Sequence, residues 1–134
     1  MNGLKAFIIH QIGTEIGKEG EGNWMALHEI NYQLLIENPK KIRKEWAHIG
    51  VVGSGDLEVL MERKDLNGAV QVKVVTPVTG FDFIWNRVLE SFITENQLGD
   101  LLIEINDNNA TPIVVSIRLA QALAEANRVE EEEI

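Results

Sequence analysis

Residues 50–75 of this chain read GVVGSGDLEVLMERKDLNGAVQVKVV, and this stretch is the clearest guide to the fold. Apolar and polar residues alternate in two runs, whose apolar members are Leu57, Val59, Met61, Val70, Val72 and Val74. Period-two alternation of this kind is typical of half-buried strands. Between the runs, Asp65–Gly68 is a turn sequence, because Asn-Gly readily adopts positive φ. The stretch therefore predicts a β-hairpin with antiparallel strands at 57–62 and 70–75.

The flanking sequence predicts two further strands and two helices. Strand-like alternation recurs at Glu29–Ile36 and at Leu101–Asn106, with a basic, solvated connector expected at Asn38–Lys44. A helical period runs from Phe81 to Thr94, with an apolar stripe at Ile84, Val88 and Phe92 flanked by Trp85 and Leu89. Thr111-Pro112 is typical of a helix start. That helix is expected to reach about Asn127 and to bury Ile113, Ile117, Ala120 and Leu123.

This order of elements predicts an α+β fold: a two-layer sandwich with a small mixed sheet and two helices on one face. The strand at 101–106 follows a helix, so it should run parallel to the strand at 70–75. Ser54 then lies at the same end of the sheet as Thr76-Pro77 and Asn106–Thr111. Both helices begin at that end, where free amides and partial positive charge favour anions.

Ser54 is the candidate functional residue. Gly53 and Gly55 flank it and have no side chains to shield its hydroxyl. No histidine or lysine stands near it in sequence, so the pattern favours a serine modified by another enzyme over a catalytic nucleophile. The alternative is a glycine-rich turn that precedes a strand.

Composition excludes several classes of function. The chain has 134 residues and a mass of 15.0 kDa, which fits one domain, and its net charge of −9 argues against nucleic-acid binding. An acidic protein can instead dock on basic partner surfaces. The chain has no cysteine, and its three histidines lack metal-ligand spacing, so any thiol must come from an attached group. Apolar runs are too short to span a membrane and no secretory signal opens the chain, so the cytoplasm is expected.

The two ends are expected to differ from the domain at 25–128. Glycines interrupt any regular pattern in residues 1–24, so no ordered core element is expected there. This segment is interpreted as a flexible extension or an over-extended start. Residues 129–134 form an acidic tail.

Four segments together resemble a known family. They are Gly50–Leu60, Thr76–Val78, the helix around Trp85, and Ile105–Pro112, in which Asn108-Asn109 replaces a Phe-Gly pair. In this order and spacing they are similar to the acyl carrier (delta) subunit of biotin-independent malonate decarboxylase, of the citrate lyase/malonate decarboxylase acyl carrier type. The resemblance covers roughly residues 46–126.

The resemblance implies that Ser54 carries 2′-(5″-phosphoribosyl)-3′-dephospho-coenzyme A through a phosphodiester. The thiol of this covalent arm would bear acetyl and malonyl groups. The implied partners are a malonate/acetyl transferase subunit, decarboxylase subunits and a prosthetic-group transferase, and the chain itself would catalyse nothing. A tethered substrate reaches several active sites at high effective concentration.

Three alternatives compete with this interpretation. The acyl carrier subunit of citrate lyase has a related fold and the same prosthetic group. A serine hydrolase would need Gly-x-Ser-x-Gly on a strand-to-helix turn, whereas here Val52 and Asp56 occupy the glycine positions and a strand follows. An interaction module without any attached group is the third alternative.

Overall fold

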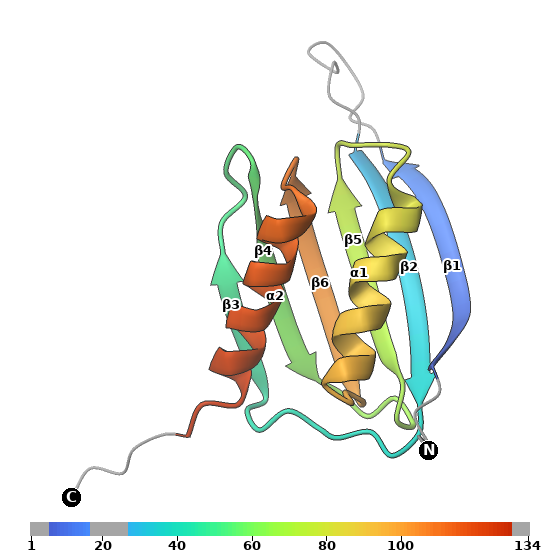
Figure 1. Ribbon diagram of the computed structural model, residues 1–134, viewed down its shortest axis with the longest axis vertical. Coiled ribbons are helices and arrows are strands. Elements are labelled where there is room, and N and C mark those ends of the chain that lie inside the picture. Colours follow the sequence, from blue (N-terminus) through green and yellow to red (C-terminus); the bar gives the residue numbers. More distant parts are fainter. Residues whose placement is uncertain (1–5, 17–26, 130–134) are drawn as a thin grey trace, which may run out of the picture.

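The computed structural model describes residues 6–16 and 27–129, which form a six-stranded mixed sheet with two helices on one face (Figure 1). Across the sheet the strand order is β1-β2-β5-β6-β4-β3. The strands are β1 (Ala6–Ile16), β2 (Leu27–Ile36), β3 (Trp46–Gly50), β4 (Asp56–Arg63), β5 (Val70–Thr76) and β6 (Leu101–Asn108), and the helices are α1 (Asp82–Glu95) and α2 (Pro112–Ala126). The predicted α+β two-layer sandwich is confirmed.

The core lies between the sheet and the two helices. Alternate residues of the inner strands are almost completely buried, among them Leu57, Val59, Met61, Val70, Val72, Val74, Leu101, Ile103 and Ile105. Trp85, Leu89 and Ile93 of α1 pack onto them, so the burial of Trp85 is confirmed. The predicted stripe Ile84, Val88 and Phe92 is half-buried beside these residues. In the described part of the chain, neither helix is long and apolar enough to cross a membrane.

The predicted hairpin is wrong, because β6 lies between β4 and β5. β6 pairs antiparallel with β4 and, as predicted, parallel with β5. Asn67 and Gly68 do adopt positive φ, at 56° and 88°. However, the amides of Leu66 and Gly68 donate to Asp100 Oδ1, at 2.9 and 2.8 Å, just before β6 begins. The turn therefore wraps around the start of β6 instead of closing a two-stranded ribbon.

The connector between β2 and β3 is more ordered than predicted. It runs along one end of the sheet, from β2 to β3 (Figure 1), and Ile42 at its centre is buried in the core. Arg63 Nη1 donates to the carbonyl oxygens of Ile42 and Arg43, at 3.3 and 2.8 Å. The connector leads into β3, a short edge strand that the sequence pattern did not predict.

The structure also places a strand in the segment that was interpreted as a flexible extension or an over-extended start. Residues 6–16 form β1, which pairs antiparallel with β2 along the opposite edge of the sheet. Glycine weakens a strand but does not forbid it where a neighbouring strand supplies hydrogen bonds. Apart from residue 129, the predicted acidic tail at residues 129–134 lies outside the described residues.

Helix α2 buries a different face from the one predicted. Ile113 is 72% exposed and Ile117 is 50% exposed, Ala120 is also exposed, and Leu123 is only half-buried. The buried residues are Val115, Leu119, Ala122 and Ala126. The helix carries apolar residues on most of its faces, so the sequence contains two apolar stripes with helical spacing, and either could be the buried one. Tertiary contacts select the buried one.

This correction predicts opposite outcomes for two neighbouring substitutions in α2. Leu119→Ala should lower the free energy of unfolding by roughly 2–5 kcal/mol, because it leaves a cavity in the core. Ile117→Ala should change it by no more than about 0.5 kcal/mol, because half of that side chain is already in solvent. Urea denaturation followed by circular dichroism measures both. Equal losses in the two variants would contradict the helix orientation described here.

Candidate functional site

Ser54 lies in a tight turn between β3 and β4. The Asp56 amide donates to the Gly53 carbonyl oxygen at 2.9 Å, which leaves Ser54 and Gly55 at the two central positions. Gly55 has φ of 74°, the value that a type II turn requires at its third residue. Ser54 is exposed, and its hydroxyl makes no hydrogen bond within the described part of the chain.

The glycines around Ser54 serve different purposes. Gly50 has φ of 91°, and a Cβ there would collide with the Leu57 carbonyl oxygen, so this glycine lets the chain enter the turn close to β4. Around Gly55 there is open space within 4 Å, and the nearest atom to a Cβ on Gly53 would be Val51 Cγ2 at 3.7 Å. The serine hydroxyl is therefore unshielded on both sides, as the sequence predicted.

An ion pair fixes this turn to α2. Arg118 donates from Nε to Asp56 Oδ1 at 2.9 Å and from Nη2 to Asp56 Oδ2 at 2.7 Å, a bidentate arrangement. Asp56 Oδ1 also accepts from the Leu57 amide at 2.7 Å. The hydrogen bonds from Arg118 and then from Leu57 lower the pKa of Asp56, and Asp56 raises the pKa of Arg118. Sequence reasoning missed Arg118, since it is 62 residues from its partner and no local signal marks it.

The turn is also joined to the end of β6. The Gly55 amide donates to the Asn108 carbonyl oxygen at 2.8 Å. Immediately beyond Asn108, the β6–α2 loop bends at Asn109, whose φ is 73°, and Thr111 caps α2 by accepting from the Val114 amide at 3.3 Å. The predicted helix start is confirmed, and Ser54 shares one end of the sheet with both helix starts (Figure 1).

A buried polar cluster holds the loops at this end of the sheet. Asp107 is 5% exposed and accepts from Thr76 Oγ1 at 2.8 Å, from the Asn109 amide at 3.1 Å and from the Ala110 amide at 3.0 Å. Thr76 Oγ1 in turn accepts from the Val78 amide at 3.1 Å. The predicted proximity of the segments at Thr76 and at 106–111 is thus confirmed. Their polar groups are occupied in holding the two loops together.

The strands next to Ser54 carry a second carboxylate, which is also paired. Glu58 Oε1 lies 3.1 Å from His48 Nε2, and Glu58 Oε2 accepts from Asn106 Nδ2 at 2.8 Å. These hydrogen bonds, with His48 first, lower the pKa of Glu58. Because the Ser54 hydroxyl contacts no basic side chain in the described residues, the site lacks the nucleophile–base hydrogen bond of a hydrolase. No group of three or more metal-ligating side chains gathers in residues 27–129.

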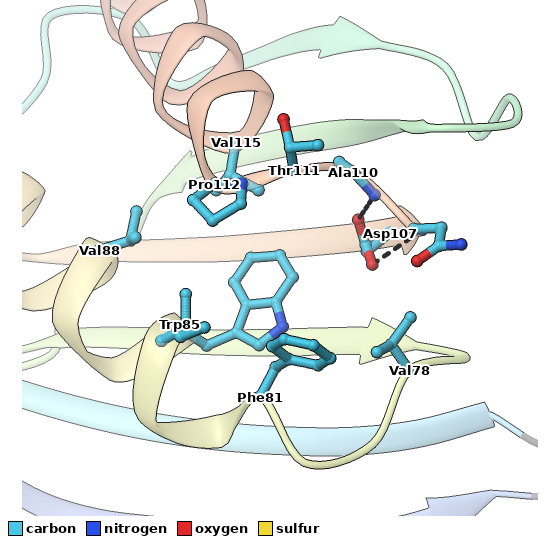
Figure 2. Close-up of a pocket in the computed structure, with 11 residues that line it drawn as sticks. Val78, Phe81, Trp85, Val88, Asp107, Ala110, Thr111, Pro112 and Val115 are labelled. Carbon is cyan, nitrogen blue, oxygen red and sulfur yellow. Dashed lines mark hydrogen bonds between the residues drawn. The ribbon is translucent and has the colours of Figure 1, made fainter.

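A pocket of about 240 Å³ opens between the starts of α1 and α2. Figure 2 shows Trp85 and Val88 on one wall and Pro112 and Val115 on the other, with Asp107 at the end of β6. Asn109, Ala110 and Thr111 of the β6–α2 loop complete that side. The sequence singled out Trp85 as a core residue but gave no sign of the pocket.

Comparison with known proteins gives a consistent result. The family described as the malonate decarboxylase delta subunit matches residues 44–126. The malonate decarboxylase acyl carrier protein of Malonomonas rubra is 53% identical over 105 residues, which cover 78% of this chain and 94% of that protein. Its counterpart in Xanthomonas euvesicatoria pv. vesicatoria (strain 85-10) is 52% identical over 97 residues, with 72% and 92% covered. A chain in the crystal structure of a Pseudomonas malonate decarboxylase hetero-tetramer in complex with malonate is 34% identical, with a TM-score of 0.65 and coverage of 73% of this chain and 97% of that one.

The ion pair between Arg118 and Asp56 predicts an acid-dependent loss of stability. Because the pKa of Asp56 is lower in the folded chain, the pair stabilises the fold above the unfolded-state pKa, and this contribution disappears as the pH falls through the folded value. Arg118→Gln should raise the pKa of Asp56, measured by carboxyl NMR titration, and should flatten the acid limb of stability against pH. Arg87→Gln, which removes a guanidinium stacked over Phe83 of α1, is the control. An unchanged Asp56 titration in Arg118→Gln would contradict the bidentate pair.

Proposed function

This chain belongs to the malonate decarboxylase acyl carrier protein (delta subunit) family, and on that premise we propose that Ser54 is the attachment site of a covalent 2′-(5″-phosphoribosyl)-3′-dephospho-coenzyme A arm. A member of this family is a carrier subunit and not a catalytic one. The observation that carries the proposal is the Ser54 turn itself, an exposed hydroxyl between two open glycines on a backbone anchored at Asp56 and Asn108.

The surroundings of Ser54 fit a phosphodiester-linked group. Its hydroxyl has no competing hydrogen bond in the described residues, and both helices begin at the same end of the sheet, where the helix dipoles favour an anion. The chain has only three serines, and the other two, Ser91 and Ser116, lie within the helices α1 and α2. A modifying enzyme would therefore meet one serine on an accessible turn.

When bound, the arm supplies the thiol on which acetyl and malonyl groups travel as thioesters, a thiol that this cysteine-free chain does not possess. The residues of the chain fix the point from which the arm extends. Arg118 and Asp56 hold the turn at a fixed point at the end of the sheet. An attached group therefore starts from a defined place and extends into solvent. Tethering raises the effective concentration of the carried group at each partner site.

Attachment requires a partner that activates Ser54. The serine oxygen forms a bond to a phosphorus atom of the activated precursor, and the phosphoanhydride bond to the leaving phosphate group breaks. The hydroxyl proton passes to a base, which the partner transferase must supply because Ser54 contacts none in the described residues. The product is a phosphodiester on Ser54.

The proposed partners are a malonate/acetyl transferase subunit, decarboxylase subunits and the prosthetic-group transferase, in the cytoplasm as expected from the sequence. The Pseudomonas neighbour is part of a malonate decarboxylase hetero-tetramer, which supports an assembly with other subunits. With a net charge of −9, the chain is suited to basic docking surfaces.

Substitution of Ser54 tests the attachment site. Ser54→Ala should fold normally, since an exposed small side chain has little to lose, but should gain no mass when co-expressed with the modifying enzymes. Ser54→Cys should also remain unmodified, because the transferase is expected to act on an oxygen nucleophile. Ser116→Ala, an exposed serine on α2, is the matched control and should gain the full arm. If intact mass spectrometry found the arm on Ser54→Ala, the assignment would be wrong.

Salt dependence tests the electrostatic part of docking. Binding to the transferase and decarboxylase subunits should weaken as ionic strength rises past about 0.15 M, where the screening length is roughly 8 Å. Surface plasmon resonance at several salt concentrations gives the slope. Binding that is indifferent to salt would instead assign docking to the exposed apolar side chains Val51, Val52, Ile113 and Ile117.

A further inference from the structure

The pocket between α1 and α2 contains a hydrogen-bond donor without a partner. Trp85 is 6% exposed, and its indole nitrogen makes no hydrogen bond within the described part of the chain but stays accessible to solvent. Figure 2 shows the ring reaching from α1 toward Pro112, with the nitrogen on the side of Phe81 and Val78. Solvent can accept from this N–H, and a ligand that displaces the solvent must supply an acceptor in its place. The pocket is therefore suited to a ligand that brings one.

The size and lining of the pocket restrict that ligand. At about 240 Å³ it is smaller than the roughly 300–1,000 Å³ of pockets that enclose drug-sized molecules, so it suits the end of a long molecule and not the whole. Its walls are mainly apolar, with Ile84, Trp85 and Val88 from α1 facing Pro112 and Val115 from α2. A small acyl group with a single polar oxygen matches this lining.

The pocket is also adjacent to the Ser54 turn. Gly55 donates to the Asn108 carbonyl oxygen at 2.8 Å, and the next four residues, 109–112, all line the pocket. The turn and the pocket thus lie on two sides of one short loop. A group attached to Ser54 has only to fold back across this loop to reach the pocket.

We propose that this pocket shelters the acetyl-thioester end of the arm, with the thioester carbonyl accepting from Trp85 Nε1. This inference rests on the proposed function. Phe81, the N-cap residue of α1, also lines the pocket and adds to its apolar wall.

The pocket disfavours a malonyl group. Its extra carboxylate would be removed from water against apolar walls. Asp107, buried at the edge of the pocket with its oxygens already accepting three hydrogen bonds, would repel that carboxylate. The acetyl form is therefore held in the pocket, whereas the malonyl form stays exposed to partner subunits.

A soluble analogue tests the pocket without any modification of Ser54. The full chain, shown by mass to be unmodified, is labelled with ¹⁵N and titrated with S-acetylpantetheine while the indole signals of Trp24, Trp46 and Trp85 are recorded. Each signal is assigned with a Trp→Phe variant. The Trp85 signal should shift and saturate while the exposed Trp46 signal stays fixed. S-malonylpantetheine should bind about tenfold more weakly, because binding would remove its carboxylate from water.

A pocket-filling variant provides the control. Ala110→Leu places extra volume in the pocket but leaves the indole N–H intact, so it should abolish the Trp85 shift, whereas Trp46→Phe should not change it. A Trp85 signal that does not respond to S-acetylpantetheine, or that responds equally in Ala110→Leu, overturns the proposal. So does a Trp85 shift that appears only when a partner subunit is added, since the pocket would then receive a partner side chain.

The modified protein gives an independent readout. In the acetyl-loaded chain, hydroxylamine should remove the acetyl group about fivefold faster from Ala110→Leu than from the parent, the effect of losing one hydrogen bond. Equal rates would overturn the sheltering role. If Ser54 never acquires the arm, the proposed function fails, while the titration of the unmodified chain still decides whether the pocket binds an acetyl thioester.

Discussion

The pairing of β6 on both of its sides is the constraint on which the rest of the structure depends. β6 runs parallel to β5 and antiparallel to β4, so every other residue from Leu101 to Ile105 is buried beneath the helices. An aspartate at each end secures it. Asp100 binds the amides of the β4–β5 connection, and Asp107 binds those of the β6–α2 loop and the hydroxyl of Thr76. With β6 fixed, the starts of both helices and the Ser54 turn converge at one end of the sheet.

The rigid groups at this end leave the serine itself unrestrained. Arg118 holds Asp56 through two hydrogen bonds, and the Gly55 amide is bound to Asn108, so the backbone on the C-terminal side of Ser54 has a defined position. The serine side chain has open space around it, because its neighbours are glycines. For the attachment proposed at Ser54, this combination would let a modifying enzyme reach the hydroxyl while the attached group starts from a fixed place.

Asp107, which is buried, and Glu58, which is half-buried, both hold neighbouring strands and loops together. Asp107 accepts three hydrogen bonds, Glu58 is paired with His48 and Asn106, and neither carboxylate is hydrogen-bonded to Ser54. A member of the acyl carrier family is a carrier subunit, and the Pseudomonas relative is a chain of a malonate decarboxylase hetero-tetramer.

The sequence by itself determined the features that arise from neighbouring residues. These features depend on contacts within a few positions of the chain. They are the strands at 57–62, 70–75 and 101–106, the Thr111 cap, the Asn67-Gly68 turn with its positive φ angles, and the unshielded Ser54. Only the tertiary structure decided the insertion of β6 between β4 and β5, the pairing of Arg118 with Asp56 and the burial of Leu119 in place of Ile117. The physical reason is the same in each case. Distant partners compete to set each of these features, and a local sequence pattern does not contain that information. This holds for the pairing of strands, for the Arg118–Asp56 ion pair across 62 residues, and for the orientation of a helix that is apolar on most sides.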